Sequence, residues 1–106
     1  MEYFFDSYAI IELILENKNY EKFKNSSINT STLNLMEVYY FLLRTYNKQT
    51  ADYWLKILKF NLANIIKLNV ALTSSFFRFN NKKEKLSYID CLGYVLSKEM
   101  GLKFLT

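Results

Sequence analysis

Short apolar runs alternate along this chain with longer stretches in which apolar residues recur at helical spacing. The opening shows both patterns, since residues 3–5 (Tyr-Phe-Phe) read as a buried strand and residues 7–16 as a helix. One carboxylate, Asp6, stands between them, with the hydroxyl of Ser7 beside it. Ligands of open α/β sheets bind in the crevice outside the carboxyl ends of the strands. We therefore expect Asp6 to be the first ligand of a metal site.

The alternation continues to the end of the chain and predicts one α/β domain over residues 1–106. Short strands between helices of ten or more residues favour a mainly parallel sheet flanked by helices. The helix at 32–46 is apolar almost all round, so we expect it to be buried on more than one side. The remaining elements are predicted as a helical turn at 17–25, a weak strand at 27–30, helices at 32–46 and 48–60, a strand at 64–68, a helix at 70–77, a solvated loop at 81–85, a helix at 88–100 that ends at Gly101, and a strand at 102–105.

The composition permits a real core and narrows the chemistry. The chain has 106 residues, of which 51% are hydrophobic and 18% aromatic, and it contains no histidine. The lack of histidine excludes Ser-His-Asp catalysis, histidine-ligated zinc and histidine general bases. One cysteine, Cys91, cannot form an intrachain disulfide and favours a reducing, cytoplasmic setting. No apolar run approaches the roughly 18 residues of a membrane span, and the N-terminus lacks the basic region of a signal peptide.

The net charge of +4 is compatible with a nucleic-acid partner without requiring one. Three lysines in the predicted loop, Lys82, Lys83 and Lys85, could attract phosphates, although a solvated loop is the simpler interpretation. Tyr39 and Tyr40 could stack on bases, but packing in the core explains them more simply.

Three carboxylates stand in apolar surroundings. Asp6 lies between Phe5 and an apolar helical run, Glu37 is the only charge from Thr32 to Leu43, and Asp90 is the only charge between Leu86 and Ser97. Burying an unpaired carboxylate costs several kcal/mol unless it is paired, coordinated or neutralised. A shared divalent cation would explain all three acids together. Ligation by oxygen alone points to Mg²⁺ or Mn²⁺.

Each acid also has a structural interpretation. Asp6 can be the N-cap of the helix that begins at Ser7. Asp90 can form a capping box with Ser87, three residues earlier. Glu37 can pair with Arg44 on the same helix or with a lysine from elsewhere. A residue at a helix start points toward the carboxyl end of a strand, so these roles can coexist with metal ligation.

Three segments together resemble a PIN domain of the kind found in VapC-type toxins of prokaryotic toxin–antitoxin pairs. They are FFDSYAIIE at 4–12, STLNLMEVYYFLLR at 31–44 and KLSYIDCLGYVLSKEMGLKFLT at 85–106. The resemblance implies a Mg²⁺- or Mn²⁺-dependent ribonuclease, with Asp6, Glu37 and Asp90 as its acids and Ser7 as the hydroxyl after the first acid. It also implies RNA as substrate, a cognate antitoxin that covers the active groove, and a homodimer.

The chain departs from this family pattern at two places. Tyr8 stands where the family often has serine or asparagine, and a fourth acid usually follows the Leu-Thr of the late strand, where this sequence reaches Thr106. We therefore expect the last strand to be missing or truncated and the strand at 102–105 to lie at a sheet edge. A catalytically silent PIN-like module that serves dimerisation or antitoxin binding is the alternative function. A helical packing domain without a site is a more distant one.

Overall fold

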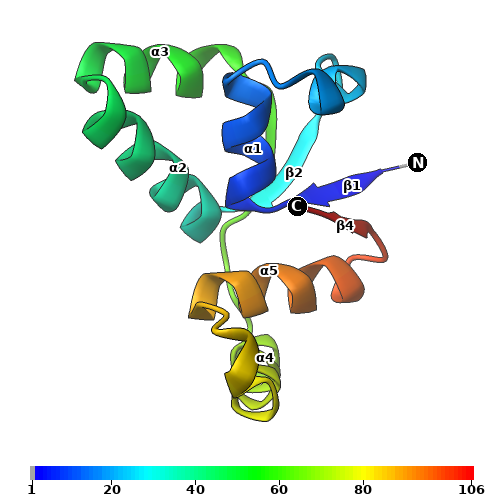
Figure 1. The fold of residues 1–106 in the computed structure, drawn as a ribbon. Helices are drawn as coiled ribbons and strands as arrows, with labels where there is room; N and C mark the ends of the chain where they lie inside the picture. The colour runs from blue at the N-terminus through cyan, green and yellow to red at the C-terminus, as the bar shows by residue number, and fades with distance from the viewer. Residues whose placement is uncertain (1) are drawn as a thin grey trace.

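A parallel sheet of four short strands runs through the middle of the molecule, with helices on both faces (Figure 1). The computed structural model describes residues 2–106. The strand order is β3-β2-β1-β4, and every neighbouring pair is parallel. The strands are β1 (Tyr3–Phe5), β2 (Ile28–Ser31), β3 (Phe60–Ala63) and β4 (Lys103–Leu105); the helices are α1 (Ser7–Ile14), α2 (Thr32–Thr45), α3 (Lys48–Ile57), α4 (Leu68–Asn80) and α5 (Tyr88–Glu99), with 3₁₀ turns η1 (Lys18–Phe23) and η2 (Lys82–Glu84).

Two hydrophobic cores lie on opposite faces of the sheet, because side chains alternate along a strand. Phe5 points into the larger core, where it packs with residues of α1, α2 and α3. Phe4 points into the smaller core, with Val70 of α4 and Leu92 and Leu96 of α5. Figure 1 shows the same division, with α1, α2 and α3 above the sheet and α4 and α5 below it. Phe4 and Phe5, which are adjacent in β1, therefore connect the sheet to the helices on both of its faces.

Polar side chains begin four of the five α-helices among residues 2–106. Asp6 caps α1, Ser31 caps α2, Asn47 caps α3 and Ser87 caps α5, each accepting a hydrogen bond from a backbone N–H in the first turn. Such caps satisfy N–H groups that have no partner within the helix. Since β1 and β2 are parallel, Asp6 and Ser31 lie at the same edge of the sheet.

The structure confirms the predicted fold class, the helical turn after α1 and the edge position of the last strand, β4. The strand predicted at 64–68 is wrong. The third strand is β3, Phe60–Ala63, and residues 64–67 connect it to α4. The predicted helix 48–60 correspondingly ends early, at Ile57. The cause is the pairing of all four β3 residues with β2, together with a side-chain hydrogen bond from Asn61 Nδ2 to Asn29 Oδ1 (3.2 Å). Among residues 2–106, no helix is both long and apolar enough to cross a membrane.

The expectation that the helix at 32–46 is buried on more than one side is also wrong. One stripe of α2 faces the core, through Leu35, Val38 and Leu42. Another stripe is exposed, and it includes Met36 (57% exposed) and Tyr40 (63% exposed). Tyr40 is therefore a surface residue rather than a core residue.

Truncation of the core stripe should be much more costly than truncation of its neighbour. Leu42 is fully buried between α2 and its neighbouring elements, whereas Leu43 is about one-third exposed. We expect Leu42→Ala to lower the free energy of unfolding by about 2 to 5 kcal/mol, because it removes buried methyl groups and leaves a cavity. Urea denaturation followed by circular dichroism measures this loss. Leu43→Ala is the matched control, and equal losses in the two variants would contradict the packing described here.

Candidate functional site

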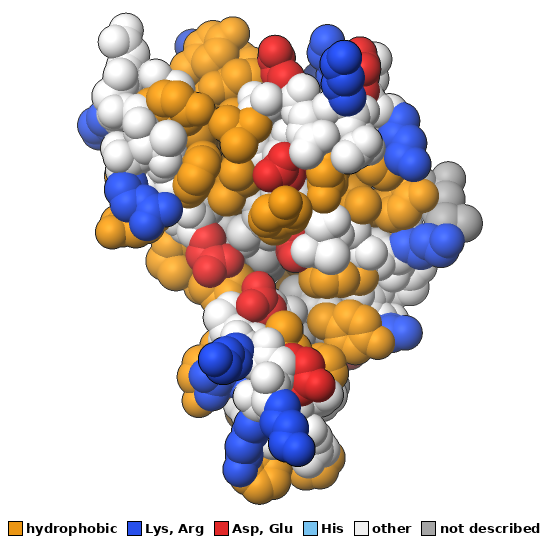
Figure 2. All heavy atoms as spheres, in the orientation of Figure 1, with side chains coloured by type: hydrophobic (Ala, Val, Ile, Leu, Met, Phe, Trp, Pro, Cys, Tyr) orange, Lys and Arg blue, Asp and Glu red, His pale blue; other side chains and the backbone are white. Residues whose placement is uncertain are grey.

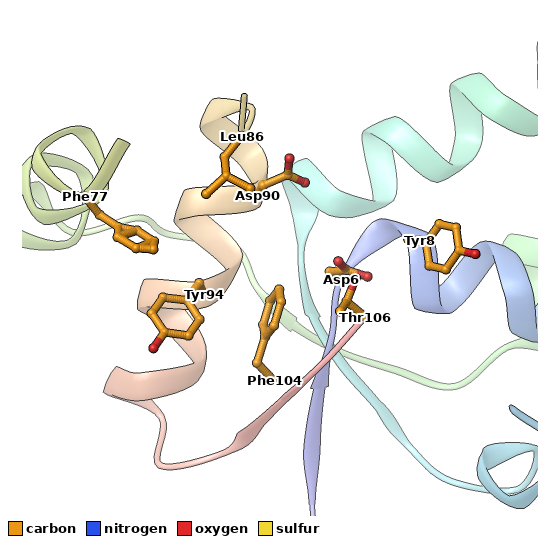
Figure 3. Close-up of a pocket in the computed structure, with 8 residues that line it drawn as sticks. All are labelled: Asp6, Tyr8, Phe77, Leu86, Asp90, Tyr94, Phe104 and Thr106. Carbon is orange, nitrogen blue, oxygen red and sulfur yellow. The ribbon is translucent and has the colours of Figure 1, made fainter. Parts of the chain in front are cut away.

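The three predicted acids lie around one groove at the carboxyl edge of the sheet. Asp6 follows β1, Glu37 lies in the second turn of α2, and Asp90 lies in the first turn of α5. Asp6 and Asp90 line a hollow of about 400 Å³. Glu37 and Asp90 line an adjoining hollow of about 360 Å³. Tyr8 and Asp90 line both hollows, so the two adjoin, and we call them together the groove. Figure 3 shows the Asp6 and Asp90 carboxylates facing the space between α1 and α5.

Asp6 is the most buried of the three acids, with only 6% of its surface exposed. Its Oδ1 accepts a hydrogen bond from the Ala9 N–H at 2.9 Å, and its own N–H donates to the Leu105 carbonyl at 2.9 Å. Burial raises the pKa of the Asp6 carboxyl, and the nearby negative charge of Asp90 raises it further. Hydrogen bonds from the Thr106 hydroxyl and the Ala9 N–H oppose that rise in pKa. Burial prevails, so the site disfavours a bare carboxylate.

Glu37 is half-buried and is held by the hydroxyl beside Asp6. Ser7 Oγ donates to Glu37 Oε1 at 2.6 Å. Asn34 Nδ2 donates to Ser7 Oγ at 3.0 Å. Hydrogen bonds to an ionised carboxylate are short and strong. Ser7, in the first turn of α1, thus orients Glu37 on α2.

Asp90 forms the capping box that its spacing from Ser87 suggested. Its N–H donates to Ser87 Oγ at 3.0 Å, and its Oδ2 accepts from the Ser87 N–H at 2.9 Å. Helix α5 approaches the sheet closely because Gly93 has no side chain. A Cβ there would lie 3.2 Å from Phe4 Cε1 and 3.8 Å from Asn34 Nδ2. Gly93 therefore helps to bring Asp90 toward the other two acids.

The structural interpretations of Asp6 and Asp90 are both confirmed, since each caps its helix. The suggested pairing of Glu37 with Arg44 is wrong. Within residues 2–106 the salt bridge present joins Lys48 to Asp52, and the Arg44 guanidinium lies over the Tyr40 ring instead. The caps do not compete with a functional role, because both carboxylates still line the groove.

The donor set fits a hard divalent cation, which prefers oxygen ligands. All three acids lack a cationic partner among residues 2–106, and burial and negative charge raise the pKa of Asp6. As the side chains stand, no three acidic or thiol groups in that part of the chain are close enough to hold one ion. The acids are therefore gathered around one groove without forming a closed ligand cluster.

The three predicted phosphate-attracting lysines lie beside this groove. Lys82 and Lys83 are in η2 and Lys85 follows it, all exposed between α4 and α5. Lys82 and Lys85 line a small hollow that shares Leu86 with the larger one. Figure 2 shows several basic side chains on the lower part of the molecule, others around its outer edges, and acidic side chains in the middle of this face. A polyanion could thus approach the acids over a basic rim.

The sequence did not reveal the positions of several residues in or behind the groove, and it favoured the core for Tyr40. Tyr8 and Tyr40 are exposed aromatic walls, Thr106 contacts Asp6, and Asn34 is buried behind Ser7. An aromatic residue or an asparagine on an apolar helix has no local pattern that reveals these roles. The position of Tyr8 directly after Asp6-Ser7 was the one available signal.

A sequence-family model, the PIN domain, matches residues 3–106. The chain belongs to the PIN-domain family. That match covers the three acids, Ser7 and the basic segment in a single unit. Among curated proteins, none matches the chain at a significant level.

Solved structures of similar shape support the assignment of this PIN domain's fold. One is VapC20 of Mycobacterium tuberculosis, described as a toxin that cleaves the sarcin–ricin loop. It has a TM-score of 0.74 and 12% identity over 95% of this chain and 85% of that one. Another belongs to a toxin–antitoxin complex from Klebsiella pneumoniae, with a TM-score of 0.69 and 17% identity over 100% of this chain and 85% of the other. At these identities the likeness shows the fold.

The buried carboxyl of Asp6 should make the metal-free PIN domain less stable as pH rises. Its pKa is higher in the folded than in the unfolded chain, so the folded state binds the proton more tightly. Stability is therefore lost as pH rises from the unfolded pKa through the folded one. In chelator, we expect Asp6→Asn to have a higher Tm than the wild type near neutral pH, with a gap that closes toward acid pH. Asparagine retains the capping oxygen.

Asp52 provides the control for this pH series, because it is exposed and its pKa is lowered rather than raised. Lys48 and Tyr39 donate hydrogen bonds to Asp52 and lower its pKa. Its contribution to stability is thus present near neutral pH and is lost as pH falls through the folded pKa. Asp52→Asn should therefore not raise the Tm at neutral pH. An Asp6→Asn variant that is no more stable than the wild type at any pH would contradict the burial argument.

Proposed function

We propose that the protein is a divalent-metal-dependent endoribonuclease of the toxin–antitoxin type, which acts in the cytoplasm. The observation that carries this proposal is the placement of Asp6, Glu37 and Asp90 around one groove at the carboxyl edge of a parallel sheet. Two findings support it, namely the PIN-domain match and the likeness in fold to VapC20, a toxin described as cleaving the sarcin–ricin loop.

Asp6, Glu37 and Asp90 would hold Mg²⁺ or Mn²⁺. When bound, such an ion supplies Lewis-acid polarisation of a phosphodiester and lowers the pKa of a water molecule. Of the chain's own groups, Ser7 keeps Glu37 oriented through its 2.6 Å hydrogen bond. One carboxylate of the three also accepts a proton from the attacking water, which is general-base catalysis. The Ala9 N–H holds Asp6 in place.

The walls of the groove suit an extended RNA strand. Tyr8 and Tyr40 are 55% and 63% exposed beside the acids, and aromatic faces stack on unpaired bases. Lys82, Lys83 and Lys85 at the opposite rim would contact backbone phosphates. The aromatic side chains and the lysines thus flank the carboxylates along one path.

Two exposed apolar surfaces support the proposal of two protein partners, an antitoxin and a second copy of this chain. Beside the groove, Tyr8, Met36 and Tyr40 are exposed on α1 and α2, where an antitoxin segment would cover the acids. The solved toxin–antitoxin complex of similar fold supports such a partner. A second surface lies along α4, which we call the α4 stripe. It consists of Leu68, Leu72, Phe76 and Phe79, all at least 60% exposed. We assign the α4 stripe to homodimer formation.

The ribonuclease proposal predicts a metal-dependent activity that needs Asp6. With Mn²⁺ or Mg²⁺, the wild type should cleave RNA, and Asp6→Asn should be slower by about 10² to 10⁴-fold, the range typical of lost acid–base groups. Asp52→Asn, an acid outside the groove, is the control and should cleave at the wild-type rate. The assay follows labelled RNA on denaturing gels with chelator as the blank. Equal cleavage by Asp6→Asn and the wild type would show that the site lies elsewhere.

A catalytically silent module gives a different result in a binding assay. If the acids hold a metal, Mn²⁺ at about 100 times its Kd stabilises the folded protein by about 2.7 kcal/mol. Asp6→Asn should lose most of that rise in Tm. A wild type that neither cleaves RNA nor gains Tm with Mn²⁺ would support the silent module for dimerisation or antitoxin binding.

The dimer proposal predicts that the α4 stripe controls self-association. Phe76→Ser removes a 66% exposed ring from the centre of the stripe, so its sedimentation should be that of a monomer at concentrations where the wild type is a dimer. Tyr53→Ser is the control, because Tyr53 is a similarly exposed ring on α3. A wild-type monomer, or the same shift in both variants, would refute this assignment.

A further inference from the structure

We infer that Asn34 is a positioning residue that fixes the orientation of the Glu37 carboxylate through the Ser7 hydroxyl. The inference rests on the proposed function, because it assigns a role within the same acidic groove. Asn34 is only 1% exposed, and it lies at the third position of α2, one turn before Glu37. Its side chain has no hydrogen bond to any of the three acids, so it would act on Glu37 through Ser7.

A one-way series of hydrogen bonds connects Asn34 to Glu37. Ser31 Oγ donates to Asn34 Oδ1 at 2.6 Å. Asn34 Nδ2 donates to Ser7 Oγ at 3.0 Å. Ser7 Oγ donates to Glu37 Oε1 at 2.6 Å. We call this series the Ser31–Glu37 relay.

The order of donors follows from what each group can give and accept. The Ser31 hydroxyl already accepts from the Asn34 N–H at 3.1 Å, so its proton is free for the amide oxygen. With that oxygen facing Ser31, the amide NH₂ faces Ser7. Ser7 Oγ then accepts from Asn34, and its single proton is left to donate. Glu37 Oε1 lies 2.6 Å from Ser7 Oγ, whereas the main-chain carbonyl oxygen of Asn34 lies 3.3 Å from it. The proton therefore goes to the carboxylate.

The surroundings of Asn34 keep its side chain in one conformation. Its side chain lies opposite Gly93 of α5, where a Cβ would approach Nδ2 to 3.8 Å. Both of its side-chain polar atoms have a partner within the relay, and residues 2–106 contain no buried side-chain polar atom without one. A buried network in which every polar atom has a partner is stiff and keeps one arrangement. Stiffness behind a ligand is what raises metal affinity.

The test compares Asn34→Leu with a matched change at another buried asparagine. Asn29 is 5% exposed, lies on β2, and donates to the Tyr3 carbonyl rather than to any acid. Asn29→Leu therefore removes a buried amide of the same kind without touching the relay. We expect Asn34→Leu to weaken Mn²⁺ binding, measured by calorimetry, by about 10- to 100-fold, as for other residues behind metal ligands. Asn29→Leu should bind Mn²⁺ like the wild type.

A double-variant comparison distinguishes positioning from a general loss of packing. If Asn34 acts only through Ser7, then Ser7→Ala and Ser7→Ala combined with Asn34→Leu should have the same Mn²⁺ affinity, because coupled residues are not additive. Losses that add independently would overturn the inference. So would a variant Asn34→Leu that binds Mn²⁺ as tightly as the wild type.

A metal-free readout separates this inference from the proposed function. In chelator, the ¹³C resonance of the Glu37 carboxyl should shift in Asn34→Leu and Ser7→Ala but not in Asn29→Leu. A wild type that binds no Mn²⁺ refutes the proposed function, and the resonance still decides whether the relay orients Glu37. An unchanged Glu37 resonance in Asn34→Leu refutes the relay even where the wild type binds Mn²⁺ and cleaves RNA.

Discussion

The hydrogen bonds of Asp6 at the carboxyl end of β1 hold the sheet edge, the first helix and the groove together. Its N–H binds the end of β4, and its side chain begins α1. The next residue, Ser7, then reaches α2 through Glu37. A short strand of three residues could not align three other elements through its own ladder alone. The polar junction after the strand provides that alignment, and it places a carboxylate where strand ends and helix starts converge.

The two-sided sheet explains how such a small chain encloses a site at all. Phe4 and Phe5 belong to different cores, so α1 and α2 are fixed from one face and α5 from the other. The acids come from both layers: Glu37 from above, Asp90 from below, and Asp6 from the sheet between. Gly93 permits the lower layer to approach the Phe4 ring. The packing on both faces of β1 thus sets the positions of the three acids relative to one another.

Local patterns in the sequence were sufficient for the fold class and for selecting three acids that lie around one groove, whereas their role as metal ligands stays a prediction. The run of Tyr3 to Phe5 followed by Asp6 is a strand, a cap and a helix within one short segment, and each part has a recognisable residue type. The β3 strand was misplaced because its residues gain their extended form from pairing with β2, which the local pattern does not contain. Asn34 was missed for a similar reason. Its partner Ser7 is 27 residues away, and asparagine in a helix looks like an ordinary polar residue.

Capping and the proposed metal ligation draw on one electrostatic arrangement. Asp6 is the N-cap of α1 and Asp90 lies in the first turn of α5, where free N–H groups and the helix dipole favour negative charge. This partial positive potential lets two acids face one groove without a salt bridge to a lysine or arginine among residues 2–106. It does not fully compensate for burial, since the pKa of Asp6 is still raised. On the proposed function, this incomplete compensation at Asp6 would favour a bound cation, because a divalent ion would supply the positive charge that the helix N-terminus does not.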